Sequence, residues 1–202
     1  PRGAMAQRET FTNSNAWFTL NGDVALNDRW AIIFDGSVRR SGPVDEAQAL
    51  FARGGVAYAL SEHVRVAVGA NWSRSYPYGE IPIAYSYPER RTWQQVVLSH
   101  SAGSIDFSHR YRLEQRWLGR RSDAAVDRID RWMRVSRVRY QVRGTVPLRG
   151  DEVEPGEGYF TFANELFINF GGNVQYNIFD QDRAVAAVGY RLSRSWRAEL
   201  GF

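Results

Sequence analysis

The chain lacks cysteine and lysine, and each absence narrows the kind of protein that it encodes. With no cysteine among its 202 residues, neither a disulfide framework nor a thiolate metal site is available. With no lysine, all 26 basic side chains are arginines. No run of about 18 apolar residues occurs, which excludes a transmembrane helix. The first residues also lack the apolar stretch of a signal peptide, so we expect that an export signal has been removed.

Apolar and polar residues alternate through most of the chain, which is the two-residue period of a β-strand. Between Phe18 and Leu26, for example, every second residue is apolar or glycine. Ten segments of this kind follow one another, at about residues 18–26, 30–39, 50–60, 64–72, 90–99, 105–117, 135–146, 159–170, 183–192 and 196–202. Their lengths are close to the roughly 9 to 11 residues that a tilted membrane strand needs.

The connections between these segments differ in length. Short ones follow the first, third, fifth and ninth segments, at Asn27–Asp28, Ser61–His63, Ser101–Ser104 and Ser193–Ser195. Long ones follow the fourth and sixth segments, at Ser73–Glu89 and Leu118–Arg134. Short turns on one side and longer loops on the other are typical of outer-membrane barrels, although Arg149–Gly158 is longer than this rule predicts. Helical spacing of apolar residues predicts one short helix in a loop, over Asp123–Trp132.

Arginines at even spacing decide which face of each segment points inward. The sixth and seventh segments each carry three arginines on one face, namely Arg110, Arg112, Arg116 and Arg137, Arg139, Arg143. An arginine on a lipid-facing side costs about 2 to 4 kcal/mol at the bilayer midplane. Three on one strand approach the whole stability of a typical domain, about 5 to 15 kcal/mol. These faces should therefore point into the barrel, with Leu113 and Tyr140 on the opposite face towards lipid.

The same alternation assigns an inward side to charged residues on the other segments. The arginines predicted to point inward are Arg39, Arg53, Arg65, Arg91, Arg110, Arg112, Arg116, Arg137, Arg139, Arg143, Arg183 and Arg197. The acids on the same faces are Asp23, Asp35, Glu89, Glu114, Glu165 and Glu199. Buried arginines need carboxylate partners, and the planar guanidinium pairs with them in a bidentate manner.

From these sets we predict a charge network or ligand-binding site in the lumen. Its candidate residues are Arg53, Arg91, Arg110, Arg112, Glu114, Arg116, Arg137, Arg139, Arg143, Glu165, Arg183 and Glu199. Two interpretations stay open. One is a structural network, since small barrels are commonly filled by their own side chains. The other is an anion-attracting lumen or a polar ligand site.

Other chemistry finds little support in the sequence. The three histidines, His63, His100 and His109, are scattered, so we expect no metal site and no cofactor. Ser99 and His100 are adjacent on a strand and point to opposite faces, so we expect no catalytic pair there. Nucleic acid is not an expected partner, because the arginines share their faces with carboxylates and alternate with residues suited to lipid.

Several motifs carry a resemblance to a known family. They are Trp17 at the start of the first strand, Arg53–Tyr58, Glu89–Gln95, His109–Arg116, Arg137–Tyr140, Asn164–Glu165 and Glu199–Phe202, of which His109–Arg116 is the most specific. Over residues 15 to 202 the chain resembles an uncharacterised bacterial domain-of-unknown-function family, whose members are regarded as outer-membrane β-barrels. The resemblance implies the fold and the location but no activity. Members of that family continue past the last motif, which implies a truncated chain.

We therefore predict an all-β, antiparallel up-and-down transmembrane β-barrel over residues 15–202, with 1–14 as an N-terminal extension or cloning remnant. The tenth strand would end on the outer side, opposite to where a barrel's terminal strand should end. We therefore expect one of two outcomes. Either a further strand follows Phe202 and, with Arg8–Asn15, raises the ten strands seen here to twelve in the native protein, or the assignment of the outer and periplasmic connections is inverted.

The predicted function is that of a non-enzymatic barrel in the bacterial outer membrane. Its interior would be a structural network, a narrow anion-preferring conduit, or a binder of an anionic small molecule. The expected partners are outer-membrane lipid, that anion, and the barrel assembly machinery during biogenesis. Two alternatives stay open: an outer-membrane barrel enzyme acting on lipid or peptide, and a soluble, lipocalin-like ligand-binding barrel.

Overall fold

A computed structural model describes residues 12–42, 44–80, 82–174 and 177–202. Its strands are β1 (Asn15–Ala25), β2 (Trp30–Ser41), β3 (Glu46–Ala59), β4 (Val64–Ser75), β5 (Tyr87–Ala102), β6 (Ile105–Arg120), β7 (Arg131–Pro147), β8 (Gly158–Phe170), β9 (Phe179–Arg191) and β10 (Arg197–Gly201). Most of the predicted extension 1–14, and most of the extra strand predicted at Arg8–Asn15, lie outside the described residues. Residues 12–14 are not in a strand.

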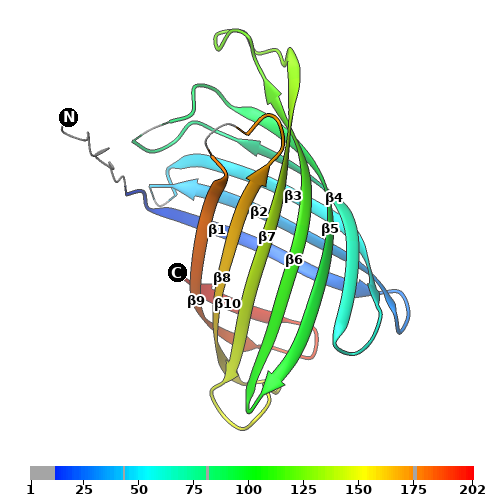
Figure 1. Ribbon diagram of the computed structural model, residues 1–202. Helices are drawn as coiled ribbons and strands as arrows, with labels where there is room; N and C mark the ends of the chain where they lie inside the picture. Colours follow the sequence, from blue (N-terminus) through cyan, green and yellow to red (C-terminus); the bar gives the residue numbers. More distant parts are fainter. Residues whose placement is uncertain (1–11, 43, 81, 175–176) are drawn as a thin grey trace, which may run out of the picture.

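The ten strands form one antiparallel sheet in which each strand pairs with its neighbour in the sequence, and this confirms the predicted up-and-down all-β fold (Figure 1). The sheet curls strongly, as twisted sheets do. Asp23 on β1 forms an ion pair with Arg65 on β4, across the inner side. In the described part of the chain no backbone pairing joins β1 to β10, so the sheet curls without closing.

The two faces of the sheet have the characters that alternation predicts. On the inner face, Trp93 packs against Ala57 and Ala67 in a small apolar cluster. Gly69 makes room for it, because a Cβ there would lie 2.4 Å from the indole ring of Trp93. On the outer face, large apolar side chains such as Leu113 and Val138 are exposed, 37% and 41% respectively.

The strands next to the long connections are longer than predicted. β5, β6 and β7 have 16, 16 and 17 residues, and β7 begins at Arg131 instead of near Val135. The alternation of apolar and polar residues fades at these ends. The backbones of β6 and β7 nevertheless stay paired as far as Arg120, whose partner is Arg131. β9 likewise begins at Phe179, four residues before the predicted start at Arg183.

The helix predicted over Asp123–Trp132 is wrong. Residues 121–130 form an irregular connection, and Trp132 lies in β7. The aspartates of this segment bond locally instead, since Asp123 accepts a hydrogen bond from the Ala125 N–H and Asp130 accepts one from the Ser122 N–H. Such side-chain bonds compete with helix formation. No helix in the described residues is long and apolar enough to cross a membrane.

Candidate functional site

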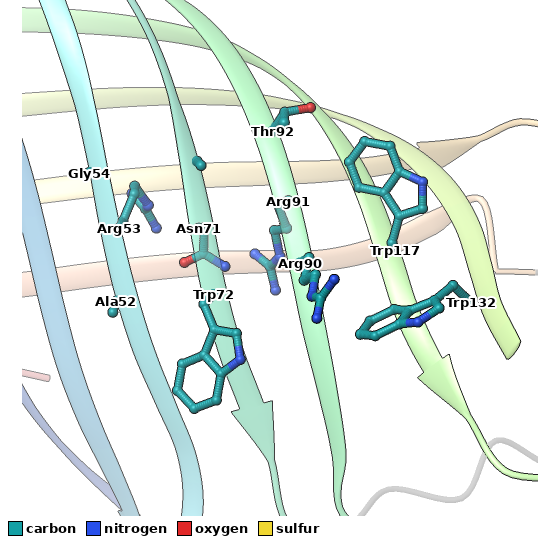
Figure 2. A pocket seen from close by; sticks show the side chains of 11 residues that line it. Ala52, Arg53, Gly54, Asn71, Trp72, Arg90, Arg91, Thr92, Trp117 and Trp132 are labelled. Carbon is teal, nitrogen blue, oxygen red and sulfur yellow. The ribbon is translucent and has the colours of Figure 1, made fainter. Parts of the chain in front are cut away.

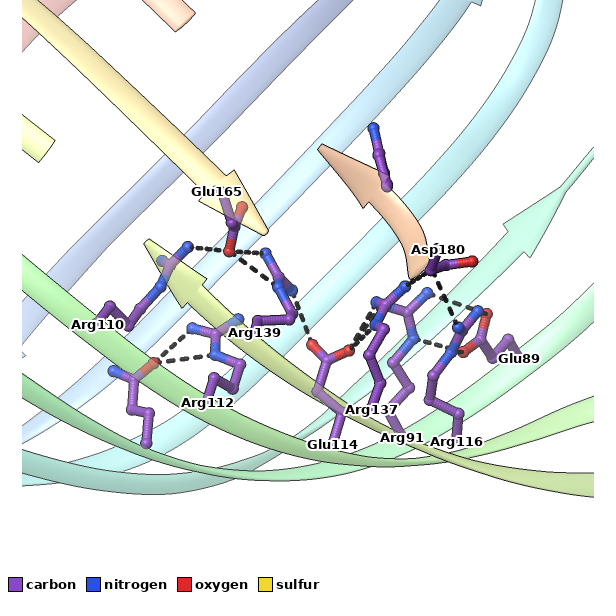
Figure 3. Close-up of polar contacts among 12 residues, drawn as sticks. Glu89, Arg91, Arg110, Arg112, Glu114, Arg116, Arg137, Arg139, Glu165 and Asp180 are labelled. Carbon is purple, nitrogen blue, oxygen red and sulfur yellow. Dashed lines mark hydrogen bonds and ion pairs between the residues drawn. The ribbon is translucent and has the colours of Figure 1, made fainter. Parts of the chain in front are cut away.

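Three buried glutamates from three strands form the centre of a charged network on the inner face. They are Glu89 on β5, Glu114 on β6 and Glu165 on β8, each no more than 2% exposed. Figure 3 shows them in a row, with arginines from β5, β6 and β7 between them. Ionised carboxylates at this depth must be paired, because an unpaired buried charge is costly.

Glu114 is the most heavily shared of the three. Arg137 Nη2 donates to it at 2.6 Å and Arg139 Nη1 at 2.7 Å, both from β7. Arg91 on β5 approaches it at 3.7 Å. One carboxylate is thus surrounded by arginines from both neighbouring strands.

Glu165 continues the network towards β8 and β9. It accepts hydrogen bonds from Arg139 at 2.6 Å and from Arg110 at 2.9 Å, and Arg183 on β9 lies 3.8 Å away. Because Arg139 contacts both Glu114 and Glu165, the two clusters are one continuous network.

Glu89 forms the third group, at the other end of the row. Arg91 and Arg116 both donate to its Oε1 at 2.6 Å. Asp180 on β9 connects this group to the centre, because it accepts a 2.8 Å bond from Arg137 and lies 3.8 Å from Arg116.

Alternation did not predict Asp180, and the structure gives the reason. Phe167 pairs with Gln181 while Ile168 pairs with Phe179, so the register shifts and Asp180 is the extra residue of a β-bulge. A bulge changes the alternation of faces along a strand.

The aromatic ring of Phe167 was missed as well. It lies 4.6 to 5.1 Å from the guanidinium carbons of Arg137, Arg139 and Arg183.

Arg112 is buried without a carboxylate. It is 4% exposed, its Nε and Nη2 both donate to the neutral amide oxygen of Gln95, and its Nη1 has no partner in the described structure. Its guanidinium carbon lies 4.8 Å from the centre of the Trp93 ring. Arg53, Arg110 and Arg139 are neighbours of like charge and Glu114 is a neighbouring carboxylate, so positive charge is in excess around Arg112.

Arg39 and Arg53 extend this cationic region towards β2 and β3. Arg39 lies between two aromatic rings, 3.9 Å from that of Trp17 and 4.3 Å from that of Phe51. Arg53 stands opposite Asp35 in the strand register. Among the described residues, neither arginine forms an ion pair within 4.0 Å.

The structure divides the predicted site residues into three groups. Eight are linked in the network: Arg91, Arg110, Glu114, Arg116, Arg137, Arg139, Glu165 and Arg183. Arg53 and Arg112 lie beside it and form no ion pair with any carboxylate that the structure describes. Arg143 and Glu199 form a separate ion pair, in which Glu199 also accepts a 2.9 Å bond from the Tyr159 hydroxyl.

Among the described residues, no group of three or more histidine and acidic side chains is placed to hold a metal ion.

The comparisons with known proteins add a family but no chemistry. No curated protein and no solved structure matches the chain. Residues 14–202 match the model of a family described as a protein of unknown function, DUF2490. The match spans nearly the whole chain and confirms the predicted resemblance to an uncharacterised domain family. The chain is therefore a member of the DUF2490 family.

Proposed function

We propose that this protein is a barrel of the Gram-negative outer membrane that holds a small anion in its arginine-rich interior. The outer face supports the membrane location. Apolar side chains exposed there include Ile32, Val56, Val68, Leu113, Val138 and Ile168. Such a surface suits lipid and would be costly in water, which disfavours a soluble, lipocalin-like barrel.

Aromatic residues border this apolar surface at both ends of the strands. Trp30, Tyr58, Tyr190 and Trp196 lie beside the short connections. Trp72, Trp117, Trp132 and Phe170 lie at the opposite ends of their strands. Two aromatic girdles around an apolar band are characteristic of outer-membrane barrels, because aromatic rings gather at the two membrane interfaces.

The observation that carries the anion proposal is the buried, unpaired Nη1 of Arg112. The carboxylates of the network are already shared between several arginines, so none of them is left for Arg112. Asp35, opposite Arg53, is a carboxylate beside Arg53 and Arg39. A buried guanidinium without a paired carboxylate is unfavourable, and a bound anion with several oxygens would neutralise it. We therefore place the anion beside Arg112 and Arg53. The competing interpretation is a purely structural network.

Thermal unfolding of the detergent-solubilised protein with sulfate or phosphate tests the anion site. A ligand of the folded state stabilises it by about 2.7 kcal/mol at a hundredfold excess over its Kd. We expect this stabilisation in the wild type and in Arg149→Gln, which changes an exposed turn residue. Arg112→Gln should lose it. If neither anion stabilises the wild type beyond the effect of chloride at equal ionic strength, the interior is a structural network.

Quenching by brominated lipids tests the membrane location without disturbing the network. A fluorophore attached to cysteine at Leu113 or Val138, both on the outer face, should be quenched strongly in liposomes. The same fluorophore at Asn27, in an exposed turn, should be quenched weakly. Equal, weak quenching at all three positions would contradict the membrane proposal.

A further inference from the structure

A groove lies on the outer face of the sheet, across β3 to β7. It has a volume of about 880 Å³. Figure 2 shows Trp72, Trp117 and Trp132 around it, with Arg90 between them. On the outer side its floor is made of small residues, Ala52, Gly54 and Ala70, which leave space that larger side chains would fill.

The strand register places the groove residues in one row. Ala52 pairs with Trp72, Trp72 with Arg90, Arg90 with Trp117, and Trp117 with Arg134. Paired residues point to the same face, so Arg134 joins Arg90 on the outside, and both are exposed. With strands about 4.8 Å apart, the backbones of the two arginines are about 10 Å apart, within reach of one shared ligand for such long side chains.

Arg90 and Arg134 have no acidic partner in the described part of the chain. The guanidinium of Arg90 lies 4.7 Å from the centre of the Trp132 ring. Among the described residues no carboxylate forms an ion pair with Arg90 or Arg134. Two positive charges, held among tryptophans on the outer face, fit an anionic group.

Polar residues beside the arginines support a position in the headgroup layer. Gln115 accepts a 2.8 Å hydrogen bond from Thr92 and exchanges bonds of 3.2 and 3.1 Å with Gln94, all on the outer face. β5, β6 and β7 have 16 or 17 residues, more than the roughly 9 to 11 that span the hydrocarbon. Their ends near the long connections therefore extend into the interface, where tryptophan and arginine are favourable.

We propose that this groove binds a membrane lipid whose headgroup carries a phosphomonoester. The phosphate would lie between Arg90 and Arg134, with an acyl chain along Ala52, Gly54 and Ala70. A phosphomonoester carries about −1.5 to −2 charges, which two arginines match. The inference rests on the proposed membrane location and is independent of the anion in the interior.

Native mass spectrometry of the detergent-solubilised protein, with added lipids, tests the site. We expect phosphatidic acid, a phosphomonoester, to bind more tightly than phosphatidylglycerol, a phosphodiester. Arg90→Gln and Arg134→Gln should each weaken phosphatidic acid binding by about tenfold, since a hydrogen bond to a charged group contributes about 1.5 to 3 kcal/mol. The control Arg194→Gln, in the exposed turn before β10, should bind as the wild type does.

Three results would overturn the proposal. The first is equal binding of the two lipids, and the second is unchanged binding of phosphatidic acid by both variants. The third is displacement of the lipid by an equal concentration of inorganic phosphate, which would make the groove a site for free phosphate. Brominated-lipid quenching at Leu113, measured on the same preparation, separates this failure from a failure of the membrane location. Strong quenching with no lipid selectivity overturns the groove proposal alone.

Discussion

The guanidinium of Arg183 on β9 lies 4.7 Å from the centre of the Trp17 ring on β1. β1 is the first strand of the sheet order and β9 the last but one, so their side chains meet only because the sheet curls around a common interior. Trp17 Nε1 also donates a 2.9 Å hydrogen bond to Gln48 on β3. Trp17 therefore connects the first strand of an open sheet with the last strand but one.

Replacing Trp17 should loosen this connection. Trp17→Ala removes cation–π contacts with Arg183 and Arg39, worth about 0.5 to 2 kcal/mol each. We expect a lower midpoint of thermal unfolding in detergent. Trp17→Phe keeps an aromatic ring and should recover most of the loss. If Trp17→Ala and Trp17→Phe unfold at the wild-type temperature, the contact between β1 and β9 contributes nothing to stability.

Glu114→Gln should destabilise the barrel by about 3 to 5 kcal/mol, because it leaves Arg137 and Arg139 without their shared buried carboxylate. Chemical unfolding in detergent measures the change. Glu62→Gln, in an exposed turn, is the matched control and should have little effect. Equal stability of the Glu114→Gln variant and the control would mean that Glu114 is solvated.

If the barrel conducts ions, it should prefer anions, because arginines outnumber acids on its inner face and cationic linings favour anions. Reversal potentials under a potassium chloride gradient across a planar bilayer measure this preference. We expect Arg53→Gln to reduce it and Arg194→Gln to leave it unchanged. A preference for potassium would contradict the prediction, and silence would favour the filled, structural network.

The hydrogen bond between Ser122 and Asp130 should persist until the solution is strongly acidic. The Ser122 N–H donates a 2.7 Å hydrogen bond to Asp130, and this bond lowers the pKa of Asp130 from its ordinary value. A lowered pKa in the folded state means that the stabilisation is complete above the unfolded pKa of about 3.9 and is lost as the pH falls through the folded value. The Ser122 amide proton shift should therefore titrate below about 3.9, and not at all in Asp130→Asn. A midpoint at or above the ordinary value would contradict this.

Period-two alternation in the sequence determined the ten strands, their order and the inward side of the arginines. This prediction has a physical basis, because a strand exposes alternate residues to opposite faces and an arginine is costly on an apolar face. The acidic partners Glu114 and Glu165 followed from the same rule. Alternation did not predict a shift in the pairing, which is why Asp180 was missed.

Only the tertiary structure decided which charges meet. Arg139 on β7 and Glu165 on β8 are on neighbouring strands but are not paired in the register. Arg110 on β6 reaches Glu165 across the whole width of β7. The pairing of Arg143 with Glu199, apart from the main network, likewise depends on how far the sheet curls. Face assignment is local, because it depends on the residue's place in its own strand. The choice of ion-pair partner depends on strand register and curvature, which arise from backbone pairing along the whole sheet.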